Sequence, residues 1–154
     1  MTPSELEAYL HKHIPMSGFM QVSVIDVHPE HVLLSAPLAP NINHRETVFG
    51  GSAAAVAVLA AWSLIHTRLS RSGLSSRLVI QRNSMSFEQP ITGTFTARSS
   101  ILKEDKWELF TRTIRRKGKA RIAVSCDLAS AGRIVGRFEG EFVALGPEAT
   151  ASGI

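Results

Sequence analysis

The chain has 154 residues and a mass of 16.7 kDa, which fits one domain large enough to bury its own core. Apolar residues make up 44% of the sequence and charged residues 19%, which excludes a disordered chain or a fibre. The net charge of +4 allows an anionic partner without identifying one. The single cysteine, Cys126, excludes an internal disulfide scaffold, and the acidic N-terminus lacks the pattern of a signal peptide. We therefore expect a cytoplasmic protein.

The first part of the chain predicts a short helix followed by a β-hairpin. Thr2 and Glu5 have capping-box spacing with Pro3 in the first helical position, and Pro15 is expected to end this helix. Residues 22–27 alternate as a strand does, and a turn then leads into a second strand over 31–36.

Residues 52–69 predict a long helix that is rich in Ala, Leu and Val and apolar almost all the way round. The 18 residues from 48 to 65 carry no charge, which reaches the lower limit for a membrane span. We interpret the segment as a buried core helix, because Gly50 and Gly51 interrupt the run and sheet-like sequence follows it.

After Gly73 the apolar pattern has a period of two, which predicts antiparallel strands. The expected strands are 77–87, 94–102, 107–116, 121–129 and 133–145. A sheet of this length has to curl. The expected fold class is therefore α+β, with a curled antiparallel sheet of five to six strands wrapped around the long central helix. We expect a single domain over residues 1–146 and a frayed tail over 147–154.

Three stretches carry a resemblance to a known family: APLAPNINH at 36–44, TVFGGS at 47–52 and FEQPITG at 87–93. They resemble the hotdog-fold thioesterase superfamily, and the branch they look most like is the thioesterase C-terminal domain of YiiD proteins. The resemblance implies a hotdog fold and hydrolysis of an acyl-CoA or acyl-carrier-protein thioester. It implies no separate cofactor, since coenzyme A or phosphopantetheine arrives as part of the substrate.

The resemblance also implies a site at the start of the central helix. A helix N-terminus carries unpaired N–H groups and about half a positive charge, and glycines there let a carbonyl approach closely. The matching residues are Gly50, Gly51 and Ser52, of which Gly51 is assigned a catalytic role. Asn43 matches a loop asparagine that positions the attacking water or the carbonyl. Further residues expected to contact the substrate are His44, Thr47 and Phe49.

The sequence departs from the broader family at two positions. Phe49 replaces the histidine of a His-Gly-Gly tripeptide, and Val58 stands where a helical carboxylate would act. Residues 51–71 contain no Asp or Glu. The general base is therefore left open among Glu46, His44 and a group donated by a second subunit, and we assign Glu46 to the catalytic set.

Six Lys and Arg residues and no acid lie within residues 112–121. They form either a solvated hairpin tip or a clamp in which Arg115, Arg116 and Lys117 bind the phosphates of coenzyme A or of a carrier protein. Aromatic residues make up only 6% of the sequence, which disfavours a nucleic-acid platform.

Other candidates have less support. Asp26 and His31 have the spacing of a hydratase pair, but they lie too far in sequence before the helix that begins at Gly50-Gly51. The histidines of this turn also have no cysteine partner for a metal site. Cys126 and His66 are expected to be packed core residues. Two functions remain open, a thioesterase and a non-catalytic acyl-thioester-binding module. We expect a homodimer or a dimer of dimers, and no metal, nucleic acid or membrane.

Overall fold

A computed structural model describes residues 1–146, and the tail expected at 147–154 lies outside the described residues. Its helices are α1 (Pro3–His13), α2 (Pro15–Phe19), α3 (Gly50–Arg71) and α4 (Lys106–Lys117), with a short 3-10 turn at Ala39–Asn41. Its strands are β1 (Ser23–Val27), β2 (Val32–Ala36), β3 (Arg77–Phe87), β4 (Phe95–Ile101), β5 (Lys119–Ser130) and β6 (Arg133–Leu145).

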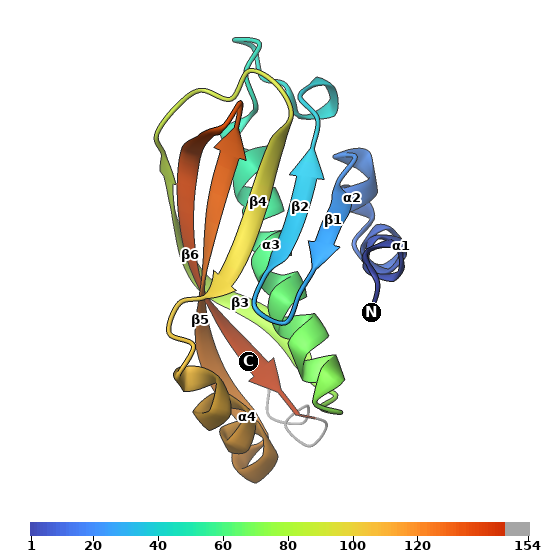
Figure 1. The fold of residues 1–154 in the computed structure, drawn as a ribbon, viewed down its shortest axis with the longest axis vertical. Coiled ribbons are helices and arrows are strands. Elements are labelled where there is room, and N and C mark those ends of the chain that lie inside the picture. The colour runs from blue at the N-terminus through green and yellow to red at the C-terminus, as the bar shows by residue number, and fades with distance from the viewer. Residues whose placement is uncertain (147–154) are drawn as a thin grey trace.

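The six strands form one antiparallel sheet in the order β1-β2-β4-β5-β6-β3. The sheet curls around α3, as Figure 1 shows. This confirms the α+β hotdog fold with its curled antiparallel sheet, here of six strands. β1 and β3 are the two edge strands, and β3 is exposed at most of its 11 positions.

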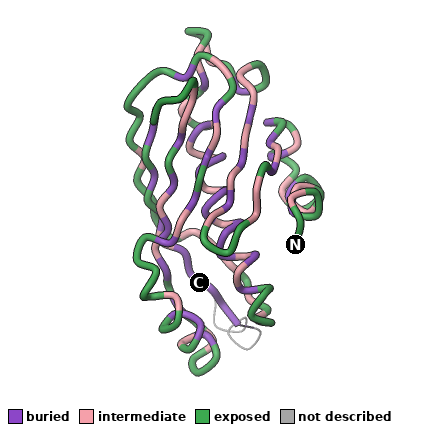
Figure 2. Tube along the Cα trace, in the orientation of Figure 1, coloured by how far each residue is buried: buried purple, intermediate pink, exposed green. Residues whose placement is uncertain are grey.

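Helix α3 is the centre of the core. Val56, Leu64 and Ile65 are completely buried, while the outer faces of the surrounding elements are exposed (Figure 2). By length and composition α3 could cross a membrane, but 61% of its most apolar window is buried inside the protein. The helix is apolar on most sides because the sheet covers it, as the sequence predicted.

The N-terminal prediction is also confirmed. Thr2 and Glu5 form the capping box, with the Glu5 N–H donating to Thr2 Oγ1 at 3.2 Å and the Thr2 N–H donating to Glu5 Oε2 at 2.7 Å. α1 ends at His13, and Pro15 then occupies the first turn of α2 instead of leading directly into the hairpin.

The strand predicted at residues 107–116 is wrong, because this segment is α4. Its buried residues Phe110, Thr111 and Ile114 have helical spacing and share one face against β5. Gly118 ends the helix in the left-handed region (φ 70°), and its N–H donates to the carbonyl of Ile114 at 2.8 Å.

This correction also removes the hairpin tip expected for the basic segment. Arg112, Arg115, Arg116 and Lys117 lie on α4, and Lys119 and Arg121 lie at the start of β5. The positive charges therefore lie where α4 leads into β5.

Candidate functional site

The loop that precedes α3 is fixed by backbone and side-chain hydrogen bonds. The side-chain amide of Asn41 is buried and donates to the carbonyls of Met20, at 2.9 Å, and Pro37, at 2.8 Å. The Phe49 N–H donates to the Asn41 carbonyl at 2.7 Å, and the Val48 N–H donates to the Ile91 carbonyl at 2.8 Å. These bonds set where α3 begins.

The first turn of α3 presents three free donors. The N–H groups of Gly50, Gly51 and Ser52 have no hydrogen-bond acceptor within residues 1–146, and Phe49 occupies the N-cap position without a side-chain hydrogen bond to the helix. These groups carry the positive end of the helix dipole. The turn can therefore polarise a carbonyl or bind an anion.

Two aromatic rings flank the glycine pair. A Cβ placed on Gly51 would lie 2.3 Å from Phe49 Cε2, so this ring covers the glycine. A Cβ on Gly50 would lie 3.4 Å from Phe87 Cζ. Both rings are 57% exposed, and their outer faces are open to a ligand. The position that a side chain would take at Gly51 is thus occupied by the Phe49 ring, while the residue itself is exposed.

A groove of about 380 Å³ lies beside this turn. It runs between the end of the preceding loop, at Thr47 and Val48, and residues 87–91, which begin with the last residue of β3. Gly50 and Ala53 form its inner wall. Phe87 belongs to this site, although the sequence indicated it only as part of a motif and gave it no role.

Asn43 holds the loop together. Its Oδ1 accepts from the N–H groups of Arg45, at 2.8 Å, and Thr47, at 3.2 Å, and its Nδ2 donates to Thr47 Oγ1 at 2.9 Å. One N–H of the Nδ2 group is left to donate. Asn43 and Thr47 are both half-buried, so they brace the loop beside the groove.

His44 and Glu46 lie at the exposed tip of the same loop. Neither side chain makes a hydrogen bond or an ion pair with the described residues. Glu46 adopts a left-handed backbone conformation (φ 61°), which turns the chain back toward α3. Both residues lie on the loop that precedes α3, and within residues 1–146 no side-chain hydrogen bond or ion pair holds either one against the glycines.

The basic residues lie elsewhere. Arg68, near the end of α3, bonds to Glu104 at 2.6 and 3.0 Å and stacks over Trp107 at 4.1 Å, which ties α4 to that end of the helix. Gly50 and Arg68 are 18 residues apart, or about 27 Å along a helix. Figure 1 shows the start of α3 and α4 at opposite ends of the molecule. Within one subunit, Arg115, Arg116 and Lys117 are therefore remote from the glycine pair.

Asp26 and His31 do meet, at 2.8 Å, and Arg98 contacts the other ring nitrogen of His31 at 3.1 Å. This cluster lies at the turn between β1 and β2, and the whole of β2 separates it from the loop before α3. It is a hydrogen-bonded surface cluster. Within residues 1–146, no group of three or more His, Cys, Asp or Glu residues is arranged to hold a metal ion.

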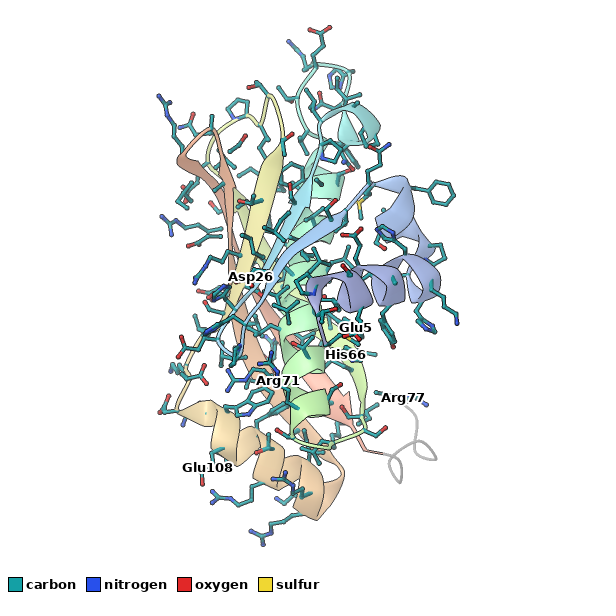
Figure 3. All side chains as sticks on the ribbon, turned by 45° about the vertical axis from the view of Figure 1, so that its right-hand side comes forward. Glu5, Asp26, His66, Arg71, Arg77 and Glu108 are labelled. Carbon is teal, nitrogen blue, oxygen red and sulfur yellow. The ribbon has the colours of Figure 1, made fainter. Side chains whose placement is uncertain are left out.

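Burial shifts two titratable groups, the buried Cys126 and the half-buried His66. Burial raises the pKa of the Cys126 thiol, with a smaller contribution from Asp127, so this cysteine stays protonated. Burial lowers the pKa of His66, which stacks between Tyr9 and Trp62 with centroid separations of 4.9 and 4.6 Å. Figure 3 shows His66 in the lower half of α3, away from the glycine turn.

A sequence profile of the family described as "Putative thioesterase (yiiD_Cterm)" matches residues 3–146. Among solved structures, a Chlorobaculum tepidum protein of unknown function is similar, with 26% identity, 94% and 97% of the two chains covered and a TM-score of 0.86. A "putative thioesterase" from Shewanella oneidensis has 24% identity, 93% and 96% coverage and a TM-score of 0.82. A "probable thioesterase" from Pseudomonas aeruginosa has 19% identity, 94% and 96% coverage and a TM-score of 0.79.

Proposed function

The chain belongs to the YiiD C-terminal thioesterase family, and on that basis we propose that it hydrolyses the thioester of an acyl-CoA or an acyl carrier protein at the start of α3. The observation that carries the proposal is the set of three unpaired N–H groups at Gly50, Gly51 and Ser52 beside an open groove. Such donors stabilise the negative charge that develops on a carbonyl oxygen under attack.

In this mechanism the carbonyl oxygen of the thioester accepts hydrogen bonds from the first turn of α3. A water molecule attacks the carbonyl carbon, the C–S bond breaks, and the thiol leaves with a proton. The free N–H of Asn43 Nδ2 donates to the water oxygen and orients it. The acyl group lies in the groove against Phe87.

The proton of the attacking water needs an acceptor. Val58 is partly buried and apolar, and α3 has no carboxylate to replace it. Glu46 and His44 are the candidates on the loop of the same subunit. Because neither is held in place by a contact, we propose that substrate binding or a second subunit completes the base.

Strand β3 supports a homodimer. It is an 11-residue edge strand that pairs only with β6 within the described residues. A long unpaired edge is an aggregation hazard unless something covers it. Antiparallel pairing of β3 with its copy around a two-fold axis would extend one sheet through both subunits.

That pairing would also bring opposite ends of the two subunits together. The Arg77 end of β3 lies on the α4 side of the molecule, and the Phe87 end lies beside Gly50. The basic end of one subunit would then lie toward the glycine turn of the other. We propose that Arg115, Arg116 and Lys117 bind substrate phosphates across the dimer in this way, in the cytoplasm, where the single unpaired cysteine remains reduced.

The absent helical carboxylate favours a second candidate function, a module that binds acyl thioesters without cleaving them. One experiment separates the two: a panel of acyl-CoA esters is tested for release of free thiol and, in parallel, for a rise in the melting temperature of the protein. Thiol release that Gly51→Ala abolishes supports the thioesterase. Thermal protection without release supports the binding module, and neither response overturns both.

A further inference from the structure

The net positive charge of the chain is concentrated around α4. Residues 103–121 contain eight Lys and Arg residues and three Asp and Glu residues, a net charge of +5, whereas the whole chain carries +4. One of those three acids, Glu104, is already paired with Arg68. Figure 3 shows a second, Glu108, pointing away from the body of the molecule. The rest of the chain is close to neutral.

A groove of about 370 Å³ lies in this basic region, between α4 and the first residues of β5. Buried Phe110 and Ile122 form its apolar floor. Leu102 and Leu109 line its sides and are 41% and 49% exposed, which is high for leucines that could have packed inward. The volume is within the range of sites for small ligands.

Cations line the same groove. Lys103, Lys106 and Arg121 are among its lining residues, and no acidic residue is. Lys103 and Lys106 form no ion pair with residues 1–146, and Arg121 has only a long contact of 3.8 Å to Glu141. These three residues are distinct from Arg115, Arg116 and Lys117, which the proposed function uses.

We propose that this groove binds the anion of a fatty acid, with the alkyl chain along Leu102 and Leu109 and the carboxylate against Lys103, Lys106 and Arg121. An apolar floor with cations at its edge is complementary to a single amphiphilic chain that carries one negative charge. The site is a groove, whereas a membrane-binding surface protrudes. It therefore fits a single alkyl chain better than a lipid bilayer. The site lies at the opposite end of α3 from the glycine turn and does not depend on the proposed catalysis.

Trp107 provides a probe of occupancy, because its ring is 5.2 Å from that of Phe110 on the groove floor. The chain has two tryptophans, so Trp62→Phe leaves Trp107 as the sole reporter. This variant is titrated with dodecanoate below its micelle concentration while fluorescence is recorded, and calorimetry on the unaltered protein gives an independent dissociation constant. Dodecanol and dodecyltrimethylammonium serve as neutral and cationic probes of equal chain length.

Matched variants locate the site. Leu109→Glu is compared with Ile25→Glu, which is similarly exposed on β1, and Lys106→Glu is compared with Lys12→Glu on α1. The two groove variants are expected to raise the dissociation constant for dodecanoate about tenfold or more, as loss of a charge-assisted contact does, and the two controls to leave it unchanged. Equal effects of groove and control variants would overturn the proposal. Equal binding of the cationic probe, or binding to anionic vesicles without binding to dodecanoate, would also overturn it.

Discussion

Replacement of Gly51 by alanine tests the proposed function most directly. The new Cβ would lie 2.3 Å from Phe49 Cε2 and 2.9 Å from Cζ, so the ring must move. Because that ring is 57% exposed, it can turn into solvent at little cost. Alanine also favours a helix over glycine by about 0.5–1 kcal/mol. The free energy of unfolding should therefore change by less than about 1 kcal/mol.

Activity should respond far more strongly than stability. The methyl group would stand beside the amides that we propose bind the thioester oxygen, and loss of one such donor costs about 3–4 kcal/mol, or at least about 100-fold in kcat. Chemical denaturation and thiol release measure the two effects. Gly50→Ala is the matched control for stability, since its Cβ would only touch Phe87 at 3.4 Å.

A double variant separates the methyl group from the ring. In a Phe49→Ala background, the methyl group of Gly51→Ala meets no ring. The substitution should then raise the free energy of unfolding by the whole difference in helix propensity between alanine and glycine. If the methyl itself obstructs the carbonyl, this double variant stays inactive. Full activity of Gly51→Ala with an unchanged KM would refute the placement of the thioester at this turn.

Four other results are expected. Asn43→Ala should lower kcat by roughly 100-fold and reduce stability, whereas Asn43→Asp should keep most of the stability, because its carboxylate still accepts the loop N–H groups, and should lose activity alone. Neutral replacement of Arg115, Arg116 and Lys117 should raise the KM for a CoA ester and weaken its salt dependence without changing kcat; an unchanged KM would exclude these residues from substrate binding. Sedimentation should show a homodimer at micromolar concentration, and a stable 16.7 kDa monomer would count against pairing through β3. Stability should fall as the pH drops below about 6.5, because the unfolded chain takes up a proton that half-buried His66 resists in the folded state; His66→Gln should flatten this part of a denaturation–pH profile.

The sequence predicted most of the fold because most of its hydrophobic patterns were compatible with only one type of secondary structure. The period-two pattern at residues 77–87 predicted β3 with the boundaries that the structure has. The all-round apolar helix had to be a core helix, since only a surrounding sheet could bury it. These elements are long, and their hydrophobic periods are unambiguous.

Helix α4 was missed because its residues favour both structures. Trp, Phe, Thr and Ile have high strand propensity, and a segment of 12 residues is short enough to match either period. The ends of the segment carried the deciding signals: Glu108 in the first turn, three cations in the last turn, and Gly118 immediately after it. These are the charge and capping preferences of a helix.

The site was predictable only at the level of the backbone. The motif located the glycine turn and Asn43, but the position of the Phe49 ring over Gly51 depends on a rotamer that no spacing encodes. The role of Asn43 in bracing the loop follows from short-range hydrogen bonds typical of asparagine in turns. Phe87 joins the site through tertiary packing, so its position in the chain did not indicate contact with Gly50.

The charges at the two ends of α3 limit where the chemistry can occur. Arg68 and Arg71 in the last turn offset the negative end of the helix dipole, whereas the first turn has neither an acidic side chain nor a capping side chain to offset the positive end. An electron-rich ligand is therefore stabilised at the glycine turn by the helix itself. The cations around α4 cannot add to that effect within one subunit, because about 27 Å of helix separates them from the turn. We propose that Arg115, Arg116 and Lys117 reach the same substrate only across a dimer, whereas Lys103, Lys106 and Arg121 serve the separate ligand of the α4 groove.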